Sequence, residues 1–332
     1  MTQPRRTPPR RGDRELFEQL PVSVWPTAQQ VARTQRRDRY VPGSAAHPAK
    51  MLPAIARHAI TRFTTPGDLV GDPMCGIGTT LVEAVHAGRH ALGVEYEPRW
   101  AELAQANLAL AAQLGAPGTG HVVQGDARHV LPQLAEQYAG QLALLLTSPP
   151  YGPSLHGHVR NDHSHGVQKF DHTYGHDRGN LAHRSVHHLL GAFTEILRTA
   201  LPLLRPGGIV AITTRPFRQD GELLDFPSLT LDAAITAGLQ PVQRCVALLA
   251  GVRDGRLVPR SSFFQLDYVR KLRARGVPAW VIAHEDLLIL QAPQKSVGSQ
   301  KSQRIQEEPK RASAPLWRSD TWVCKDSEGV VA

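Results

Sequence analysis

The segment Asp72-Pro73-Met74-Cys75-Gly76-Ile77-Gly78-Thr79-Thr80 is the strongest structural signal in this chain. Leu69 and Val70 precede it, and the helix-like run Leu81-Val82-Glu83-Ala84-Val85 follows it. This order predicts a strand, a glycine turn and a helix. Because Gly76 and Gly78 have no Cβ, such a turn lets backbone N–H groups and a helix N-terminus approach a ligand closely.

A glycine turn alone is also a common structural element, but two further features of the sequence favour a ligand-binding role for this one. Glu95 ends the apolar run Ala91-Leu92-Gly93-Val94. An acid about 20 residues after the glycines is typical of sites that hold the hydroxyls of a ribose. Thr147-Ser148-Pro149-Pro150-Tyr151 ends a later apolar run. Together these stretches predict a nucleoside-like cofactor on one side of a pocket and a planar amine on the other.

Apolar runs alternate with helical patterns along most of the chain, which predicts an α/β fold. We expect seven strands, at residues 69–72, 91–95, 121–124, 142–146, 209–213, 242–249 and 287–290. Helical patterns occupy residues 27–37, 52–60, 79–86, 99–114, 128–137, 186–204, 228–237 and 264–275. This alternation predicts a mostly parallel sheet with helices on both faces. Ligands bind at the carboxyl ends of such strands, where Asp72, Gly76, Glu95, Asp126 and Ser148 are expected.

Composition limits the classes of protein to which the chain can belong. Its 332 residues, 41% of them hydrophobic, suffice for a large core, and a net charge of +9 favours a polyanionic partner over an acidic one. A basic tail on an ordinary enzyme would give the same charge. Cys75, Cys245 and Cys324 form no Cys-x-x-Cys pair, which predicts neither a disulfide framework nor a cysteine zinc site. The sequence shows no signal peptide and no apolar run of roughly 18 residues, so we predict a cytoplasmic protein without a membrane partner.

Changes in composition predict three parts: a basic, partly disordered N-terminal arm (1–44), a domain (45–292) and a mostly disordered tail (293–332). Trp317 and Trp322 are unusual in such a tail, and they could dock back on the domain. Within the domain, residues 152–184 have little periodicity and many histidines, and residues 253–260 form a charged hairpin or loop. The histidine-rich loop could bind a metal or line a substrate pocket. Its spacings match no common zinc pattern, so we predict no metal.

These motifs resemble the S-adenosylmethionine-dependent amino methyltransferases that act on DNA. His47-Pro48-Ala49-Lys50 is similar to the segment before the family's first strand, and residues 72–80 are similar to its Asp-Pro-Phe-x-Gly-Ser-Gly-Thr-Thr loop, with Met74 and Ile77 as departures. The resemblance implies a Rossmann-like class I methyltransferase fold with S-adenosylmethionine as cofactor. It implies cofactor-binding roles for Lys50, Asp72, Pro73, Met74, Cys75, Gly76, Gly78, Thr79, Thr80, Glu95 (ribose) and Asp126 (adenine amino group). It implies catalytic roles for Ser148, Pro149, Pro150 and Tyr151.

The chemistry of amine methylation explains the residues of the Ser-Pro-Pro-Tyr motif. A base's exocyclic amine attacks poorly because its lone pair is shared with the ring. Hydrogen bonds from that amine to the Ser148 hydroxyl and the Pro149 carbonyl would make its nitrogen more nucleophilic. The two prolines hold the carbonyl outward, and Tyr151 offers a face for stacking. The target base must be flipped out or single-stranded. The reaction needs no cysteine nucleophile, so Cys75 is expected only to line the pocket.

A serine at the head of the motif resembles the enzymes that methylate cytosine at N4, so the resemblance implies a site-specific DNA methyltransferase of the restriction-modification type. Three alternatives remain. One is an RNA (tRNA) base amino methyltransferase, whose Pro-Pro-Tyr-Gly ending is echoed by Tyr151-Gly152, although such enzymes usually carry an upstream RNA-binding domain. The others are an adenine-N6 DNA methyltransferase and a non-catalytic nucleic-acid-binding protein on this fold. Target recognition is expected in the loop 152–184, the segment 253–260 and the basic arm. The target sequence, a restriction partner and the oligomeric state stay open.

Overall fold

One eight-stranded sheet organises the computed structural model, which describes residues 20–150, 158–162, 166–170, 181, 185–219 and 221–294. The strand order is β1-β11-β14-β8-β5-β2-β3-β4. The bounds are β1 Val24–Trp25, β2 Leu69–Asp72, β3 His90–Glu95, β4 Gly120–Gln124, β5 Leu142–Thr147, β8 Leu204–Thr214, β11 Gln240–Leu248 and β14 His284–Gln291. All neighbours pair in parallel except β14, which runs antiparallel to both β8 and β11.

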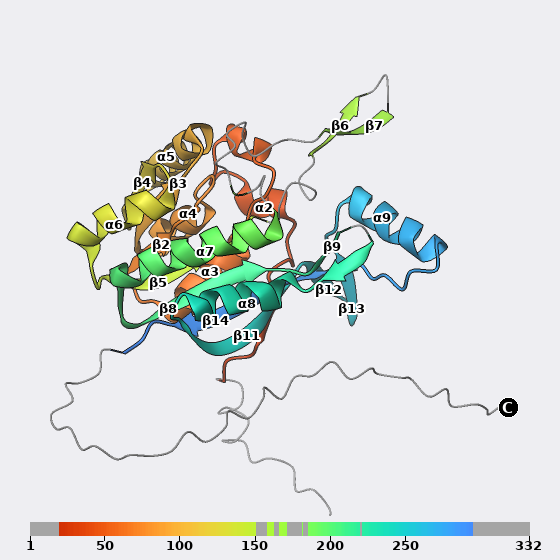
Figure 1. Ribbon diagram of the computed structural model, residues 1–332. Coiled ribbons are helices and arrows are strands. Elements are labelled where there is room, and N and C mark those ends of the chain that lie inside the picture. The colour runs from red at the N-terminus through yellow and green to blue at the C-terminus, as the bar shows by residue number, and fades with distance from the viewer. Residues whose placement is uncertain are drawn as a thin grey trace, which may run out of the picture. The chain divides into compact units, whose positions relative to one another are not determined.

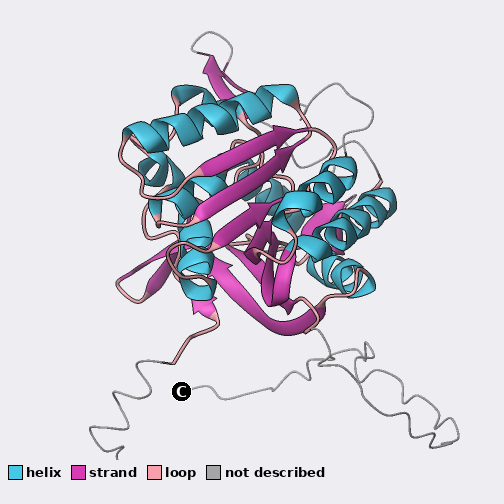
Figure 2. Ribbon diagram, turned by 90° about the vertical axis from the view of Figure 1, so that its left-hand side faces the viewer, coloured by secondary structure: helices cyan, strands magenta, loops and turns pink. Residues whose placement is uncertain are grey.

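Helices cover both faces of this sheet, as Figure 1 and Figure 2 show. The first set is α3 Pro53–Phe63, α4 Thr79–His86 and α5 Pro98–Gln113, and the second is α6 Ala127–Tyr138, α7 Val186–Ala200 and α8 Phe226–Thr236. Alternate residues of β5 divide between two apolar clusters, because side chains of a strand point to opposite faces in turn. Leu144 and Leu146 pack with the first set, and Leu145 packs with the second.

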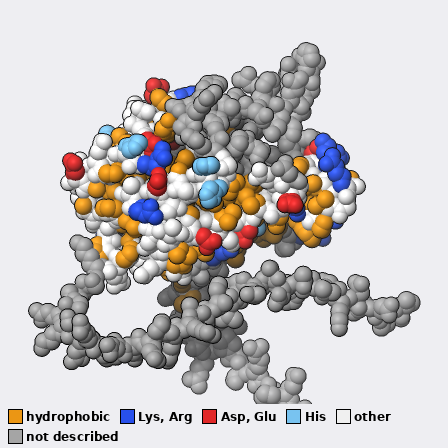
Figure 3. All heavy atoms as spheres, viewed as in Figure 1, with side chains coloured by type: hydrophobic (Ala, Val, Ile, Leu, Met, Phe, Trp, Pro, Cys, Tyr) orange, Lys and Arg blue, Asp and Glu red, His pale blue; other side chains and the backbone are white. Residues whose placement is uncertain are grey.

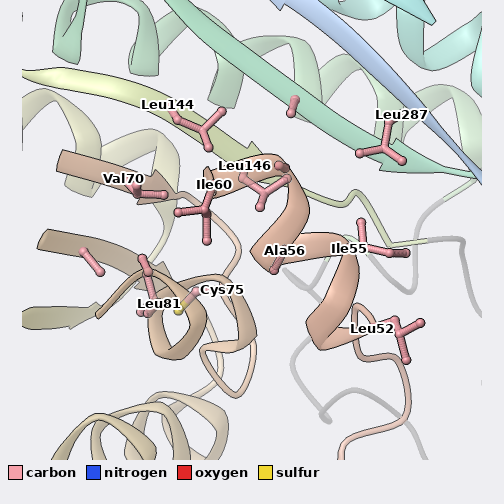
Figure 4. Packing of buried hydrophobic residues seen from close by; sticks show 14 of the residues in the cluster. Leu52, Ile55, Ala56, Ile60, Val70, Cys75, Leu81, Leu144, Leu146 and Leu287 are labelled. Carbon is pink, nitrogen blue, oxygen red and sulfur yellow. The ribbon is translucent and has the colours of Figure 1, made fainter. Parts of the chain in front are cut away.

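The first cluster is continuous from α3 to the far strands of the sheet. Figure 4 shows Ile55 and Ile60 of α3 among Val70, Leu144 and Leu146 of the two central strands. Ile55, Ile60 and Leu144 are completely buried. Full burial of one such side chain contributes about 1.5–3 kcal/mol to stability. The apolar spacing on α3 therefore fixes the segment that enters the glycine turn.

The predicted α/β fold with a mostly parallel sheet is confirmed, and its strand order is that of the Rossmann-like class I methyltransferase fold. The strand count of seven was one too low, because β1 is only two residues long and pairs with β11 at the sheet edge. The helix predicted to reach residue 204 ends at Ala200, and a short 3₁₀ turn, η4 Leu201–Leu203, leads into β8. Pro202 lies in that turn, where it cannot continue an α-helical hydrogen-bond ladder.

Residues 20–46 form β1 at the sheet edge, helix α2 Ala32–Arg36, which packs against α3, and the 3₁₀ turn η1 Pro42–Ala46, which is hydrogen-bonded to α5. Trp25 is buried against the ring of His58, with ring centroids 4.2 Å apart. The helical pattern predicted over residues 27–37 forms only the five-residue α2. Residues 1–19 of the predicted basic arm (1–44) lie outside the described residues, and so do residues 295–332 of the predicted tail, including Trp317, Trp322 and Cys324.

A buried carboxylate on α4 ties this N-terminal segment to the domain. The Glu83 side chain is fully buried and accepts a hydrogen bond from the Tyr40 hydroxyl at 3.0 Å. It also forms ion pairs with Arg57 at 3.1 Å and Arg39 at 3.3 Å. A buried charge without partners would be costly, so these three contacts hold residues 39 and 40 in one place on α3 and α4. This anchor precedes the His47–Lys50 segment.

Three hairpins interrupt the alternation. Residues 152–184 were predicted without regular structure, yet β6 His158–Asp162 and β7 Gly166–Phe170 pair antiparallel within them. The segment predicted as a charged hairpin or loop forms one, with β12 Ala250–Arg253 and β13 Arg256–Pro259. The third joins β9 Phe217–Gln219 to β10 Glu222–Leu224, and helix α9 spans Phe263–Ala274. Among the described helices, none combines the length and the apolar character that crossing a bilayer requires.

Candidate active site

The glycine turn lies where β2 ends and α4 begins. Gly76 and Gly78 adopt the left-handed region, with φ of 54° and 79°, and Gly78 is the residue before the first turn of α4. The Cys75 N–H donates to the Val94 carbonyl at 2.9 Å, which holds the turn against β3. A side chain at Gly93 would meet Leu81 Cδ1 at 2.5 Å and Cys75 Sγ at 2.9 Å. Glycine at residue 93 is thus what lets the turn approach β3 so closely.

Asp72 holds the shape of this turn. Its carboxylate accepts hydrogen bonds from the Met74 N–H at 3.1 Å and from the Thr80 hydroxyl at 2.7 Å, so one side chain joins the end of β2 to the first turn of α4. Burial raises the pKa of Asp72 to about 6, against the opposing effect of those hydrogen bonds. The carboxylate also lines the pocket described below.

Glu95 is the second buried carboxylate, at the end of β3. One oxygen accepts from the Gly76 N–H at 2.7 Å, and the other accepts from the Glu97 N–H at 2.9 Å. Burial raises the pKa of Glu95 to about 7, even though both hydrogen bonds favour the charged form. A carboxylate has about four acceptor positions, so each oxygen keeps capacity for a hydroxyl of a ligand. This is the placement that the sequence predicts for a ribose-binding acid.

Asp126 lies at the end of β4, as predicted, but its carboxylate already has a partner. It caps α6 by accepting from the Arg128 N–H at 2.9 Å, and Arg128 Nη2 donates to Oδ2 at 2.6 Å. Burial acts to raise the pKa of Asp126, but the hydrogen bonds from Arg128 outweigh it and lower the pKa below the ordinary value. An adenine amino group bound here would share this carboxylate with Arg128, which sequence reasoning did not anticipate.

Lys50 and His47 also line the pocket that contains the carboxylates. The Lys50 ammonium donates to the carbonyls of Ala45 and His47, and burial, together with the nearby charge of Arg36, lowers its pKa to about 8. The His47 ring is buried against Gly76 and meets the edge of the Trp100 ring, with centroids 4.6 Å apart. Both side chains face the same pocket.

One pocket, with about 910 Å³ of empty space that is partly open to solvent, unites these groups. Twelve of the fifteen predicted site residues line it: Lys50, Asp72, Pro73, Met74, Cys75, Gly76, Thr79, Thr80, Glu95, Asp126, Ser148 and Pro150. The structure therefore brings the glycine turn and the Ser-Pro-Pro segment, which are far apart in sequence, to one place.

Three predicted site residues are not among the residues that line the pocket. Gly78 and Pro149 do not line the pocket, and Tyr151 lies outside the described residues. Cys75 does line it, and burial followed by the charge of Glu95 raises the pKa of its thiol well above the ordinary value, which favours the protonated form. A protonated thiol is a poor nucleophile, in agreement with a lining role.

Sequence reasoning missed several lining residues: His47, Ala49, Met51, Ile77, Tyr96, Gly125, Ala127, Arg128, Leu181 and Ile196. A signal existed for some. Tyr96 and Arg128 each lie within two residues of a predicted strand-end acid, and His47 opens the segment that contains Lys50. Leu181 and Ile196 had none, because they come from the chain around α7 and reach the pocket only through the tertiary fold. Among the described residues, no group of three or more histidine, cysteine or acidic side chains could hold a metal. The predicted alternative metal site in the histidine-rich loop lies mostly outside these residues.

Comparison with known proteins finds similarity to methyltransferases. Residues 6–106 match a DNA methylase family, which supports an amino methyltransferase family. The chain is 37% identical over 164 residues to the 4-amino-L-phenylalanine/4-methylamino-L-phenylalanine methyltransferase of Streptomyces pristinaespiralis, covering 48% of each chain. It is 34% identical over 109 residues (32% of this chain, 30% of the relative) to the tRNA (guanine(10)-N2)-dimethyltransferase of Methanocaldococcus jannaschii. It is 28% identical over 74 residues (22% and 14%) to the type II methyltransferase M.MjaII of the same organism. The chain thus spans less than half the length of each of these relatives.

S-adenosylmethionine is the cofactor that the resemblance implied, and the match to the DNA methylase family supports it. The pocket fits the molecule: Glu95 keeps acceptor capacity for ribose hydroxyls, and Asp126 offers acceptors at the adjacent strand end. The positive φ of Gly76 turns the chain beside Glu95, where no side chain of residue 76 occupies the pocket.

The raised pKa of Glu95 predicts that cofactor affinity depends on pH. Below about pH 7 the carboxyl is protonated and accepts hydroxyl hydrogen bonds poorly, so affinity should rise with pH between 6 and 7.5, by up to about tenfold per unit below the pKa. The stability of the ligand-free protein should depend on pH in the opposite direction. The folded pKa exceeds the ordinary 4.5, so the neutral form stabilises the fold, and that contribution is lost as pH rises from about 4.5 to 7.

Calorimetry with S-adenosylhomocysteine at several pH values measures this dependence. Glu95→Gln should bind S-adenosylhomocysteine more weakly, and its affinity should vary less over the same pH range. The variation that remains comes from Asp72, whose pKa is about 6 and which titrates in both proteins. An affinity of the unaltered protein that stays constant from pH 6 to 7.5 would contradict the assignment of Glu95 to the hydroxyls.

Proposed function

We propose that the protein transfers a methyl group from S-adenosylmethionine to the exocyclic amino group of a base in DNA, at N4 of cytosine. One observation carries the proposal: Ser148 and Pro150 line the same pocket as Gly76, Glu95 and Asp126. An amine held at the Ser-Pro-Pro segment would therefore meet the reactive end of a cofactor held by the glycine turn. The net charge of +9 suits a polyanionic substrate.

The residues of the chain position and activate the amine. When bound, S-adenosylmethionine supplies an activated methyl group on a positively charged sulfur. The Ser148 hydroxyl and the Pro149 carbonyl accept hydrogen bonds from the amine, which draws its lone pair out of the ring and toward the pocket. Pro149 does not itself line the pocket, but it lies between Ser148 and Pro150, which do, and the fixed φ of the two prolines limits how its carbonyl can turn. Tyr151, the next residue after Pro150, would stack on the base.

Two relatives favour a second candidate, in which the amine belongs to another molecule. One relative is named for 4-amino-L-phenylalanine, whose amine is also attached to an aromatic ring, and another for guanine N2 of tRNA. The same acceptors at Ser148 and Pro149 would serve any planar aromatic amine. The geometry of the pocket thus supports amine methylation, and the substrate's size is decided by what lies around the pocket.

Methyl transfer to three substrates separates these functions. Tritiated S-adenosylmethionine is incubated with the protein and either genomic DNA, total tRNA or 4-amino-L-phenylalanine. We expect label in DNA, and nucleoside chromatography should place it in N4-methyldeoxycytidine. Label confined to tRNA or to the amino acid would replace the proposed substrate, and label in N6-methyldeoxyadenosine would replace the proposed base.

A further inference from the structure

The segment between β11 and β14 lies at the same edge of the sheet as the pocket. The pocket lies at the carboxyl ends of β2, β3, β4 and β5, and β8 runs parallel to β5. Because β14 is antiparallel to both β8 and β11, the strand β11 also ends at this edge. The hairpin β12–β13 and helix α9 therefore start from the pocket edge, three strand spacings from β5, or roughly 14 Å at the level of the sheet.

This segment is rich in exposed positive charge, and Figure 3 shows Lys and Arg side chains gathered over α9. The exposed cations are Arg253, Arg256, Arg270, Lys271, Arg273 and Arg275. Only two acids accompany them: Asp254, and Asp267, which pairs with Arg270 and Lys271 at 2.7 Å each. Across the described part of the chain, the side chains of Arg253, Arg256 and Arg275 have no hydrogen-bond or ion-pair partner. Structural ion pairing thus does not account for the arginines of the hairpin.

Helix α2 extends this charge toward the pocket. Arg260 at the end of the hairpin donates to the carbonyl of Gln29 at 3.1 Å, which fixes the chain just before α2 beside it. Arg33 and Arg37 of this region are exposed, with Asp38 as the neighbouring acid. The guanidinium of Arg36 donates to the carbonyl of Met51, which lines the pocket. Cations therefore run from the pocket wall through α2 to the hairpin.

Exposed apolar and aromatic side chains lie among these cations. Trp280 is 72% exposed and Tyr268 is 44% exposed. The segment of Trp280 is held in place, because Arg273 donates to the carbonyl of Ala279 at 3.1 Å and Arg218 donates to that of Pro278 at 3.4 Å. A fixed, exposed indole beside arginines is typical of surfaces on which nucleic-acid bases stack.

We propose that this basic edge, defined as Arg33, Arg37, Arg253, Arg256, Arg270, Lys271, Arg273 and Arg275, binds the phosphate backbone of the substrate DNA beside the target base. The proposal rests on the proposed function, because a flipped base at Ser148 leaves its flanking nucleotides at this edge. Phosphate contacts position a nucleic acid without reading its sequence. Trp280 supplies a stacking face for an unpaired neighbouring base.

The test compares two double variants that remove the same charge. Arg253→Ala/Arg256→Ala alters the basic edge. Arg62→Ala/Arg198→Ala alters exposed arginines in the last turns of α3 and α7, which precede β2 and β8 and so lie at the opposite edge. Anisotropy of a fluorescein-labelled DNA duplex, with S-adenosylhomocysteine present, gives Kd over roughly 50 to 200 mM salt.

We expect the basic-edge variant to bind about tenfold or more weakly at low salt, and its log–log salt slope to fall by about 2, since each phosphate contact contributes about 0.9. The control should match the unaltered protein. Calorimetry with S-adenosylhomocysteine should give one affinity for all three proteins, which verifies that they are folded. Trp280→Ala should weaken binding of single-stranded DNA more than of the duplex.

Three results would overturn the proposal: no DNA binding by the unaltered protein, equal Kd and slope in both double variants, or tighter binding of an RNA of the same sequence. These results can be distinguished from a failure of the proposed function. Methylation of DNA together with unchanged binding by the variant would leave the function and remove this surface. Weaker DNA binding by the basic-edge variant, in a protein that does not methylate DNA, would support this surface and remove the proposed function.

Discussion

Replacement of Ser148 by alanine is expected to lower kcat for methyl transfer about 10²- to 10³-fold. The loss of one preorganised hydrogen-bonding group at a reacting centre usually has an effect of this size. Ser148 is half-buried at the end of β5, and it lines the pocket together with Glu95 and Gly76. Without its hydroxyl, only the Pro149 carbonyl would accept from the amine, and the lone pair would stay in conjugation with the ring.

Single-turnover methylation measures this effect, and cofactor binding separates it from misfolding. Calorimetry with S-adenosylhomocysteine should give the same affinity for Ser148→Ala and the unaltered protein, since the carboxylates of Asp72 and Glu95 are intact. Ser148→Asn retains an acceptor at the head of the motif and should recover part of the rate. Undiminished transfer by Ser148→Ala would remove this residue from the mechanism.

The central part of the fold could be predicted because its signals are local. The apolar run of β5 and the helical spacing of α3 each specify one element, and the glycines between β2 and α4 mark a turn that few other residues permit. The two-residue β1 carries no periodicity of its own. It becomes a strand only because the edge of β11 is available for pairing. The reason that β1 forms therefore lies in the assembled sheet and not in the sequence around Trp25.

The features of the candidate site that could be predicted are also the local ones. Strand-end residues such as Asp72, Glu95 and Ser148 could be predicted, because parallel strands bring their carboxyl ends to one edge. The engagement of Asp126 by Arg128 could not, since it depends on side-chain conformations at the start of α6. The pKa of Glu95, about 7, also depends on burial that only the folded chain provides. Sequence thus predicts which groups meet, and the structure determines their partners and charge.

Replacement of Gly76 by alanine should weaken S-adenosylhomocysteine binding by about 10- to 100-fold. Residue 76 has φ of 54°, where a side chain costs about 1–2 kcal/mol. A Cβ there would also lie 3.0 Å from Nε2 of His47, whose buried ring is backed by Trp100 and has little room to retreat. Relief of that contact would move the Gly76 N–H away from Glu95, and the loss of a hydrogen bond to a charged group costs about 1.5–3 kcal/mol.

Gly67→Ala is the matched control for this substitution, because it separates backbone strain from the contact with His47. Gly67 has φ of 88°, and no atom lies within 4 Å of the position that its Cβ would take. It precedes β2 at the edge of the sheet opposite the pocket. Both variants should lose about 1–2 kcal/mol of stability from backbone strain. Gly76→Ala should lose more in thermal unfolding, because of its contact with His47, and only Gly76→Ala should lose cofactor affinity. If the two variants bind S-adenosylhomocysteine equally well, the turn at Gly76 does not hold Glu95 in the geometry that the cofactor requires.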